Sequence, residues 1–212
     1  GLGDVYKRQV EVDVEDAVAG FHIEMWAKAP ELYSVRIISP TGERTAGVRV
    51  QQDGREVYRF VFENTQVIID YHIVGTATGD QLIYIRFDRP TRGIWTIEVN
   101  GDYSIEGRYH MWLPITGLIA GDISFIRSNP DTTITMPGNA AAPMTVGGYN
   151  AGNDSIYLNS SRGYTASGLV KPDFAAPGVN VIGPAPGNRF EARSGTSIAA
   201  AITAGAAALY LE

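Results

Sequence analysis

Residues 171–211 read KPDFAAPGVNVIGPAPGNRFEARSGTSIAAAITAGAAALYL, and this stretch decides the fold of the second half of the chain. From Ser197 to Leu211 it is rich in alanine, the residue with the highest helix propensity. Side chains this small predict a helix that neighbouring backbones approach closely. Short apolar segments precede it at residues 144–148 and 180–182, as is typical of buried parallel strands. The second half is therefore expected to be α/β.

A serine stands where the predicted helix begins, in the sequence Ser194-Gly195-Thr196-Ser197. The first backbone N–H groups of a helix lack partners, and its dipole is positive there. A nucleophile at Ser197 would have an amide donor beside it for a developing oxyanion, as acyl transfer requires. Gly195 is expected to bend the chain sharply and to leave room for a substrate. The alternative interpretation is plain helix capping, because serine and threonine are favoured N-cap residues.

Further motifs at fixed spacing accompany this serine, and together they resemble the signature of the subtilase family of serine proteases. The resemblance covers roughly residues 132–212. It implies that Ser197 is the catalytic nucleophile, supported by Gly195 and Thr196. Many subtilases carry proline and histidine after the serine, where this chain has Ala201 and Ile202. The matching motifs are K-P-D at 171–173, A-P-G at 176–178, G-T-S-x-A at 195–199 and A-G-A-A-A-L at 204–209.

The resemblance extends upstream to a substrate-pocket loop formed by Thr135, Met136, Pro137 and Gly138. In the family this proline commonly follows a cis peptide bond, and Thr135 is expected at the base of the pocket. The buried strand at 144–148 and the S-S-x-G turn at 160–163 follow in the family's order.

The catalytic partners of the serine are not found. A serine protease of this kind needs a histidine base and an aspartate, and in subtilases both precede the serine. His72 is interpreted as one half of a solvent-facing pair with Asp70 on a strand, and His22 and His110 as structural or surface residues. Asn153, in an A-G-N sequence that resembles an oxyanion loop, is interpreted as a surface turn residue. The chain is thus expected to be a C-terminal fragment without activity of its own.

The first half of the chain alternates between apolar and polar residues and is expected to be all β. It resembles the jelly-roll module inserted in the catalytic domain of clostridial spore-germination subtilases. Its aromatic residues are interpreted as sandwich core rather than as a carbohydrate-binding surface; they are Trp26, Tyr33, Trp95, Tyr109 and Trp112. Strands are expected at 10–15, 21–27, 33–39, 46–51, 57–63, 67–74, 82–88 and 93–99, with turn signals at 40–42, 53–54, 79–80, 92–93 and 100–101.

Three regions are therefore expected: a non-native or truncated leader at 1–9, a jelly-roll β-sandwich at 10–126, and the C-terminal portion of a subtilase domain at 127–212. A hydrophobic content of 44% with 19% charged residues is that of a globular protein. The net charge of −6 argues against a phosphate-binding surface for nucleic acid. The absence of cysteine excludes disulfides. No apolar run reaches the roughly 18 residues of a membrane span.

The expected function is that of a subtilisin-type serine endopeptidase, acting on proteins or peptides through an acyl-enzyme on Ser197. The upstream half of the same catalytic domain is the expected partner. No cofactor is identified; the resemblance alone implies calcium, without assignable ligands. It also implies a secreted, spore-associated or cell-surface location. Two alternatives stay open: a pseudoprotease, which degenerate D-x-G and H-G-x-H motifs upstream would reveal, and a jelly-roll module that binds a glycan or protein, which a glycan array would reveal.

Overall fold

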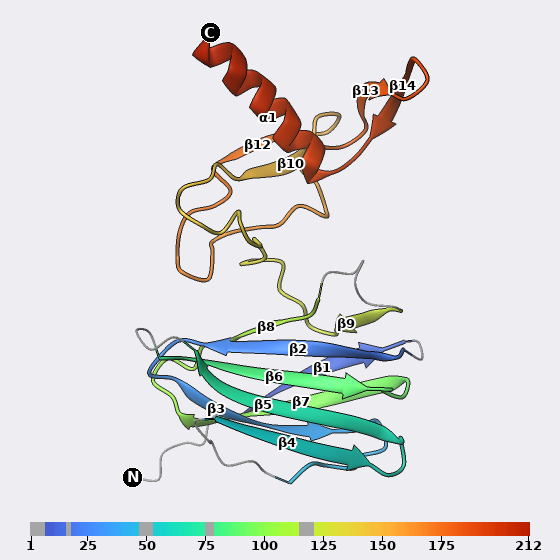
Figure 1. Cartoon of the computed structure of the whole chain (residues 1–212), viewed down its shortest axis with the longest axis vertical. Helices are drawn as coiled ribbons and strands as arrows, with labels where there is room; N and C mark the ends of the chain where they lie inside the picture. Colours follow the sequence, from blue (N-terminus) through green and yellow to red (C-terminus); the bar gives the residue numbers. More distant parts are fainter. Residues whose placement is uncertain (1–6, 16–17, 47–52, 75–78, 115–120) are drawn as a thin grey trace. The chain divides into compact units, whose positions relative to one another are not determined.

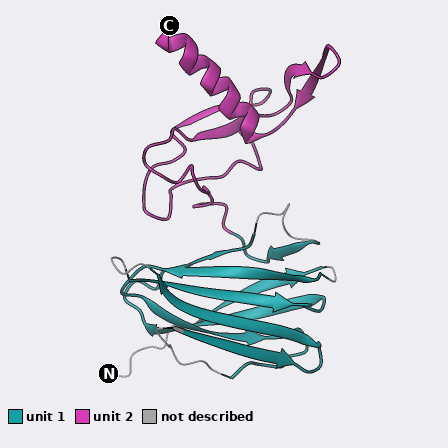
Figure 2. Ribbon diagram, viewed as in Figure 1, with its two compact units in different colours: residues 1–128 teal, residues 129–212 magenta. Residues whose placement is uncertain are grey.

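The computed structural model divides the chain into two units, Gly1–Ser128 and Asn129–Glu212 (Figures 1 and 2). It describes residues 7–15, 18–46, 53–74, 79–114 and 121–212. Among these residues the first unit is built from strands, and the second combines short strands with one helix.

The first unit is a sandwich of two sheets in which all neighbouring strands run antiparallel (Figure 1). One sheet has the order β3-β7-β1-β9 and the other the order β4-β5-β6-β2-β8. The expectation of an antiparallel all-β first half is confirmed. The strands are β1 (Lys7–Val14), β2 (Gly20–Ala27), β3 (Leu32–Ile38), β4 (Asp53–Phe60), β5 (Thr65–Val74), β6 (Asp80–Asp88), β7 (Gly93–Tyr103), β8 (His110–Trp112) and β9 (Ile123–Phe125).

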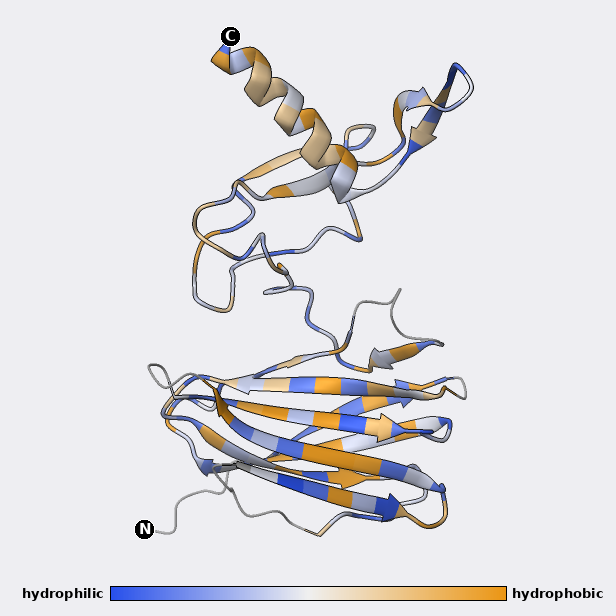
Figure 3. Ribbon diagram, viewed as in Figure 1, coloured by the Kyte–Doolittle hydropathy of each residue, from blue (hydrophilic) through white to orange (hydrophobic). Residues whose placement is uncertain are grey.

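Apolar side chains from both sheets meet between them and form the core, and the strands alternate in hydropathy along their length (Figure 3). On β2, Phe21 and Ile23 are buried while the residues beside them are half-buried. Trp95 of β7 meets the rings of Phe60 and Phe87 edge-on, with centroids 5.1 and 5.4 Å away. Aromatic rings prefer this arrangement. The period of two in the sequence is therefore the period of burial.

Local turn signals placed several strand ends wrongly. Asp53 and Gly54, expected in a turn, begin β4, and Asn100 and Gly101 lie inside β7. The strand expected at 57–63 ends at Phe60. Residues 47–51 of another expected strand lie outside the described residues. β7 pairs with β1 on one side and β3 on the other, and these two ladders outweigh the turn preference of Asn-Gly.

The predicted leader at 1–9 overlaps β1. Lys7, Arg8 and Gln9 pair with β7, opposite Asn100, Val99 and Glu98, so excluding residues 7–9 from the fold was wrong. Ladder hydrogen bonds join backbone groups, and pairing therefore continues past the point where apolar alternation begins. Residues 1–6 lie outside the described residues.

Two of the five aromatic residues interpreted as core lie on the outer face of the five-stranded sheet. Tyr33 and Trp95 are fully buried, and Tyr109 packs against the core. Trp26, however, alternates with the buried residues of β2, and Trp112 of β8 pairs with the same outward row. The core interpretation was therefore wrong for Trp26 and Trp112, because alternation shows two faces but not which one is covered.

Asp70 of β5 does not face solvent beside a histidine as expected. Its carboxylate is buried and accepts two hydrogen bonds from the Arg55 guanidinium of β4, at 2.6 and 3.1 Å. Arg55 lies directly opposite Asp70 in the ladder. His72 is exposed near the end of β5. The solvent-facing interpretation thus fits His72 and was wrong for Asp70, which forms a cross-strand ion pair.

A buried carboxylate anchors the segment that follows β7. Glu31 is 5% exposed and accepts hydrogen bonds from the hydroxyls of Tyr33 and Ser104, at 2.6 and 2.9 Å. The backbone N–H groups of Ile105 and Glu106 also donate to it, at 2.8 and 2.7 Å. Burial by itself raises the pKa of Glu31, but these donors outweigh burial and lower the pKa to about 2.

We expect Glu31→Ala to lower the free energy of unfolding by about 2 to 4 kcal/mol at pH 7, because it leaves buried donors unpaired. The folded pKa lies below the ordinary value of 4.5, so the ionised carboxylate stabilises the fold fully above that pH. The gap between wild type and variant should shrink as the pH falls from 4.5 towards 2. Urea titrations at pH 7 and about pH 3 measure both effects. Glu106→Ala, at a carboxylate 67% exposed, is the control; a pH-independent gap would contradict the assignment.

The second unit packs one helix against a small sheet. β10 (Val146–Asn150) and β12 (Phe174–Pro177) run parallel, and β11 (Ser155–Ile156) pairs antiparallel with β10. The helix α1 (Thr196–Leu211) contacts β10 and β12. β13 (Val181–Ala185) and β14 (Arg189–Arg193) form a separate antiparallel hairpin. A parallel strand pair covered by a helix confirms the α/β expectation.

The two strands predicted in this unit are only partly right. The first, at 144–148, begins two residues later, at Val146. The second, at 180–182, was expected to be buried and parallel, but it lies in the β13–β14 hairpin, where Ile182 is 72% exposed. The parallel partner of β10 is the segment Phe174–Pro177, whose alanines and proline carry no strand signal. No helix among the described residues is long and apolar enough to cross a membrane.

Candidate active site

Ser197 follows Thr196, the first residue of α1, and its side chain is exposed. The carbonyl of Gly195 accepts the first helical bonds, from the N–H groups of Ile198 and Ala199 at 3.1 and 3.4 Å. Among the described residues, the N–H groups of Thr196 and Ser197 have no such partner, as expected for the first turn of a helix. The prediction that Ser197 lies within one residue of the start of a helix ending near Leu211 is confirmed. That its side chain faces an open cleft stays a prediction, because Ser197 is not among the residues that line the cavity beside α1.

Neither Ser194 nor Ser197 caps the helix. The N-cap position is Gly195, and no side chain caps it. The hydroxyl of Ser194 accepts the N–H of Asn180 at 2.9 Å. Within the part of the chain that the structure describes, the hydroxyl of Ser197 makes no hydrogen bond. The capping interpretation is therefore wrong for Ser197, whose hydroxyl is exposed beside unpaired N–H donors.

The chain bends at Gly195, as expected, just before α1 begins. The bend is made with extended dihedral angles, φ 162° and ψ 152°. A Cβ added there would meet nothing closer than the backbone nitrogen of Ser197, at 3.9 Å. The open space expected next to the serine is present.

The A-P-G motif brings the helix close to the sheet. The N–H of Gly178 donates to Tyr149 of β10, and the N–H of Gly195 donates to Gly178, both at 2.8 Å. A Cβ added at Gly178 would lie 3.2 Å from the oxygen of Gly195 and 3.6 Å from the Cβ of Ala199. Ala199 is fully buried. The predicted close backbone approach is thus realised here, and it holds the first turn of the helix against the sheet.

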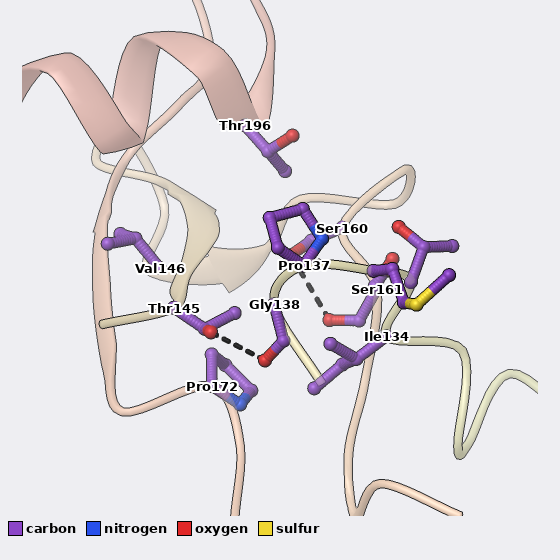
Figure 4. A pocket seen from close by; sticks show the side chains of 11 residues that line it. Ile134, Pro137, Gly138, Thr145, Val146, Ser160, Ser161, Pro172 and Thr196 are labelled. Carbon is purple, nitrogen blue, oxygen red and sulfur yellow. Dashed lines mark hydrogen bonds between the residues drawn. The ribbon is translucent and has the colours of Figure 1, made fainter. Parts of the chain in front are cut away.

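An open cavity of about 180 Å³ lies beside the start of α1 (Figure 4). Residues from five segments of the second unit line it, and one of these segments is the start of α1, which contributes Thr196. None of the lining side chains is charged, and several carry hydroxyl groups. The lining residues are Ile134, Thr135, Met136, Pro137, Gly138, Thr145, Val146, Ser160, Ser161, Pro172 and Thr196.

The four residues predicted to form the substrate-pocket loop all line this cavity: Thr135, Met136, Pro137 and Gly138. The peptide bond between Met136 and Pro137 is cis, as predicted. Thr135 is exposed, so its predicted place at the base of a pocket stays a prediction.

Hydrogen bonds hold the cavity wall together. The hydroxyl of Thr145 donates to the carbonyl of Gly138 at 2.7 Å, a contact drawn in Figure 4. The hydroxyl of Ser160 accepts the N–H of Gly148 at 3.0 Å and so joins the S-S-x-G turn to β10. The S-S-x-G and K-P-D motifs pointed to Ser160, Ser161 and Pro172, but nothing in the sequence singled out Thr145.

The residues set aside as unsuitable partners lie where their interpretations require. Asn153 is exposed in the turn between β10 and β11, where its side-chain oxygen accepts the N–H of Ser155 at 3.1 Å. All three histidines belong to the first unit. His22 stacks on Tyr84 at 4.9 Å and His110 on Trp112 at 5.9 Å. The second unit therefore contributes a serine without a histidine.

No group of three or more histidine, aspartate or glutamate side chains that could hold a metal ion occurs among the described residues. The structure accordingly adds no ligand set for the calcium that the family resemblance implied.

Residues 118–212 match the subtilase family. This segment contains the serine at the start of α1, the unpaired amides beside it and the adjacent cavity. The chain therefore carries a segment of the subtilases, the subtilisin-like serine proteases. The match begins before the second unit, within the last part of the first.

Three proteins illustrate the relationship. The serine protease AprX of Bacillus subtilis is 38% identical over 106 residues, covering 40% of this chain and 24% of AprX. The C5a peptidase of Streptococcus pyogenes is 32% identical over 93 residues, covering 44% of this chain and 8% of that protein. The structure of the Clostridium perfringens CspB protease matches with a TM-score of 0.85 and 26% identity, covering 97% of this chain and 44% of CspB. The chain thus spans only a part of each relative, and the match to CspB includes the sandwich.

Proposed function

We propose that this chain is a part of a subtilisin-like serine endopeptidase with Ser197 as its nucleophile. The observation that most directly supports this proposal is the hydroxyl of Ser197, which is exposed and unpartnered at the start of α1. It lies in a segment that matches the subtilases. Its oxygen attacks the carbonyl carbon of the scissile bond while a histidine outside this chain takes the hydroxyl proton. The peptide C–N bond then breaks, and the leaving amine receives that proton from the histidine. The acyl-enzyme is then hydrolysed by water.

The unpaired backbone N–H of Ser197 is suited to stabilise the oxyanion, because the N-terminal end of a helix carries a partial positive charge. Thr196 assists from the cavity side, and an asparagine upstream of this chain supplies the second donor. The cavity receives the substrate side chain that precedes the scissile bond. Its uncharged lining favours an uncharged side chain, since a buried charge without a partner is costly.

We propose that the upstream half of the catalytic domain completes the second unit. Ala199 is the one buried residue among the sixteen of α1. Leu209 and Leu211 of the helix are 76% and 83% exposed, and Phe174 of β12 is 53% exposed. Parallel sheets are normally covered on both faces, and large exposed apolar areas mark contact surfaces. We infer that the upstream segment of the same protein covers these side chains.

The sandwich is proposed to be the inserted jelly-roll module, residues 10–126. The chain passes from one sheet to the other between β1 and β2, β2 and β3, β3 and β4, β6 and β7, β7 and β8, and β8 and β9, and such crossings support this connectivity. The relatives support a protein or peptide substrate. The family resemblance supports a secreted, spore-associated or cell-surface location.

A fluorophosphonate probe tests the proposal. The full-length protein that contains this chain should be labelled stoichiometrically at Ser197, as peptide mapping by mass spectrometry would show. The chain of residues 1–212 alone should stay unlabelled, because general-base assistance typically contributes about 10² to 10⁴-fold and the base lies outside it. Absence of labelling in the full-length protein would favour a pseudoprotease. Rapid labelling of the isolated chain would show that the base has been misassigned.

A further inference from the structure

The K-P-D motif at 171–173 places a buried charge behind the cavity wall. The side chain of Lys171 is 5% exposed, and its ammonium group donates to the carbonyl of Pro143 and to the carboxylate of Asp173, both at 2.7 Å. Pro172, between the two charged residues, lines the cavity, whereas Lys171 and Asp173 do not. The motif therefore has one residue in the wall and two anchoring residues behind it.

Asp173 carries the connection to the strand β10. Its Oδ2 accepts the backbone N–H of Thr145 at 2.7 Å, and its own N–H donates to the carbonyl of Thr145 at 2.8 Å. The hydrogen bond from Lys171, followed by that from Thr145, lowers the pKa of Asp173 below its ordinary value. The carboxylate is therefore ionised at neutral pH, and it accepts a hydrogen bond from Thr145, the residue just before β10.

Thr145 passes this constraint to the pocket loop. Its hydroxyl donates to the carbonyl of Gly138 at 2.7 Å, and a Cβ added at Gly138 would lie 3.1 Å from the Thr145 methyl. The other end of the loop is tied by Thr133, whose N–H donates to the carbonyl of Arg162 at 2.9 Å. The loop between these ties, 134–138, supplies nearly half of the cavity lining.

We propose that Lys171 and Asp173 are positioning residues for substrate selectivity. The ion pair fixes Thr145, Thr145 fixes Gly138, and the loop 135–138 thereby keeps the shape that selects the side chain preceding the scissile bond. This inference rests on the proposed function. A purely stabilising ion pair would instead change the free energy of unfolding and leave selectivity unaltered, since leaving the buried ammonium group of Lys171 without its partner is destabilising in any context.

Two variants break the connection at different points. Asp173→Asn removes the charge, and Thr145→Val removes only the hydroxyl that reaches Gly138. Thr145→Ser keeps that hydroxyl and should restore wild-type behaviour. Glu191→Gln is the matched control, because the ion pair of Glu191 with Arg193 has a similar length, 3.1 Å, but its side chains are 54% and 65% exposed.

The measurement uses the full-length protein and peptides that differ only in the residue before the scissile bond. The ratio of kcat/KM between the best and the poorest uncharged residue should fall about tenfold in Asp173→Asn and in Thr145→Val, since misplacement by about 1 Å can cost more than that. Fluorophosphonate labelling of Ser197 should stay close to wild type in Asp173→Asn, because Asp173 does not line the cavity. The N–H of Asn139, which donates to Thr135 at 3.2 Å, should exchange with solvent faster in both variants.

Unchanged selectivity and unchanged Asn139 exchange in Thr145→Val, with Ser197 still labelled, would overturn the inference and leave the proposed function standing. A wild-type protein that is neither labelled nor active would overturn the proposed function, and Asn139 exchange would then still test the connection through Thr145. If Asp173→Asn does not fold, Thr145→Val and Thr145→Ser decide the question, because neither disturbs the buried charge.

Discussion

Replacing Ser197 by alanine in the full-length protein is expected to lower kcat/KM for peptide hydrolysis by at least about 10⁴-fold. The variant loses the attacking oxygen and with it the acyl-enzyme route. Its stability should change by no more than about 0.5 kcal/mol, because the side chain is exposed and makes no hydrogen bond within the described residues. Steady-state kinetics and a thermal melt measure the two quantities.

Ser194→Ala is the matched control for this prediction. Ser194 lies three residues earlier, and its hydroxyl accepts the N–H of Asn180 at 2.9 Å. Its loss should cost about 1 kcal/mol of stability and leave the labelling of Ser197 intact. If Ser197→Ala kept more than a few per cent of the activity while Ser194→Ala lost it, the nucleophile would have been assigned to the wrong serine.

Gly163→Ala is expected to destabilise the full-length protein by about 3 kcal/mol or more and to abolish the cavity. A Cβ added at Gly163 would overlap the carbonyl oxygen of Lys171 and lie 2.9 Å from its carbonyl carbon. Both neighbours are backbone atoms, so the clash is relieved only if the S-S-x-G turn moves away from the K-P-D segment. Ser161 and Pro172, on the two segments, would then separate. Chemical denaturation measures the loss of stability.

The same substitution at another glycine, Gly205→Ala, is expected to have no destabilising effect. Gly205 lies inside α1, and a Cβ added there meets nothing within 4 Å. Alanine in a helix is favoured over glycine by about 1 kcal/mol, so this variant should be as stable as wild type or more so. Similar denaturation midpoints for Gly163→Ala and Gly205→Ala would contradict the prediction, because they would show that the S-S-x-G turn moves away without a loss of stability.

Sequence patterns predicted the sandwich better than they predicted its strand ends. Alternation identified the buried faces of strands such as β2, since apolar residues at every second position must meet a core. Turn signals failed at Asp53 and at Asn100, because pairing with a neighbouring strand contributes more than a local turn preference. Trp26 and Trp112 were assigned to the core although the outer face of the sheet holds them.

For the candidate site, the sequence by itself determined the position of Ser197, because the start of an alanine-rich helix depends on neighbouring residues alone. Only the tertiary structure decided what lies around it. The parallel pairing of β10 with the segment Phe174–Pro177 brings Thr145 to Asp173, and the close approach at Gly178 brings the helix to the sheet. These contacts join segments that are tens of residues apart, and no period or motif within one segment specifies which distant backbone it will meet.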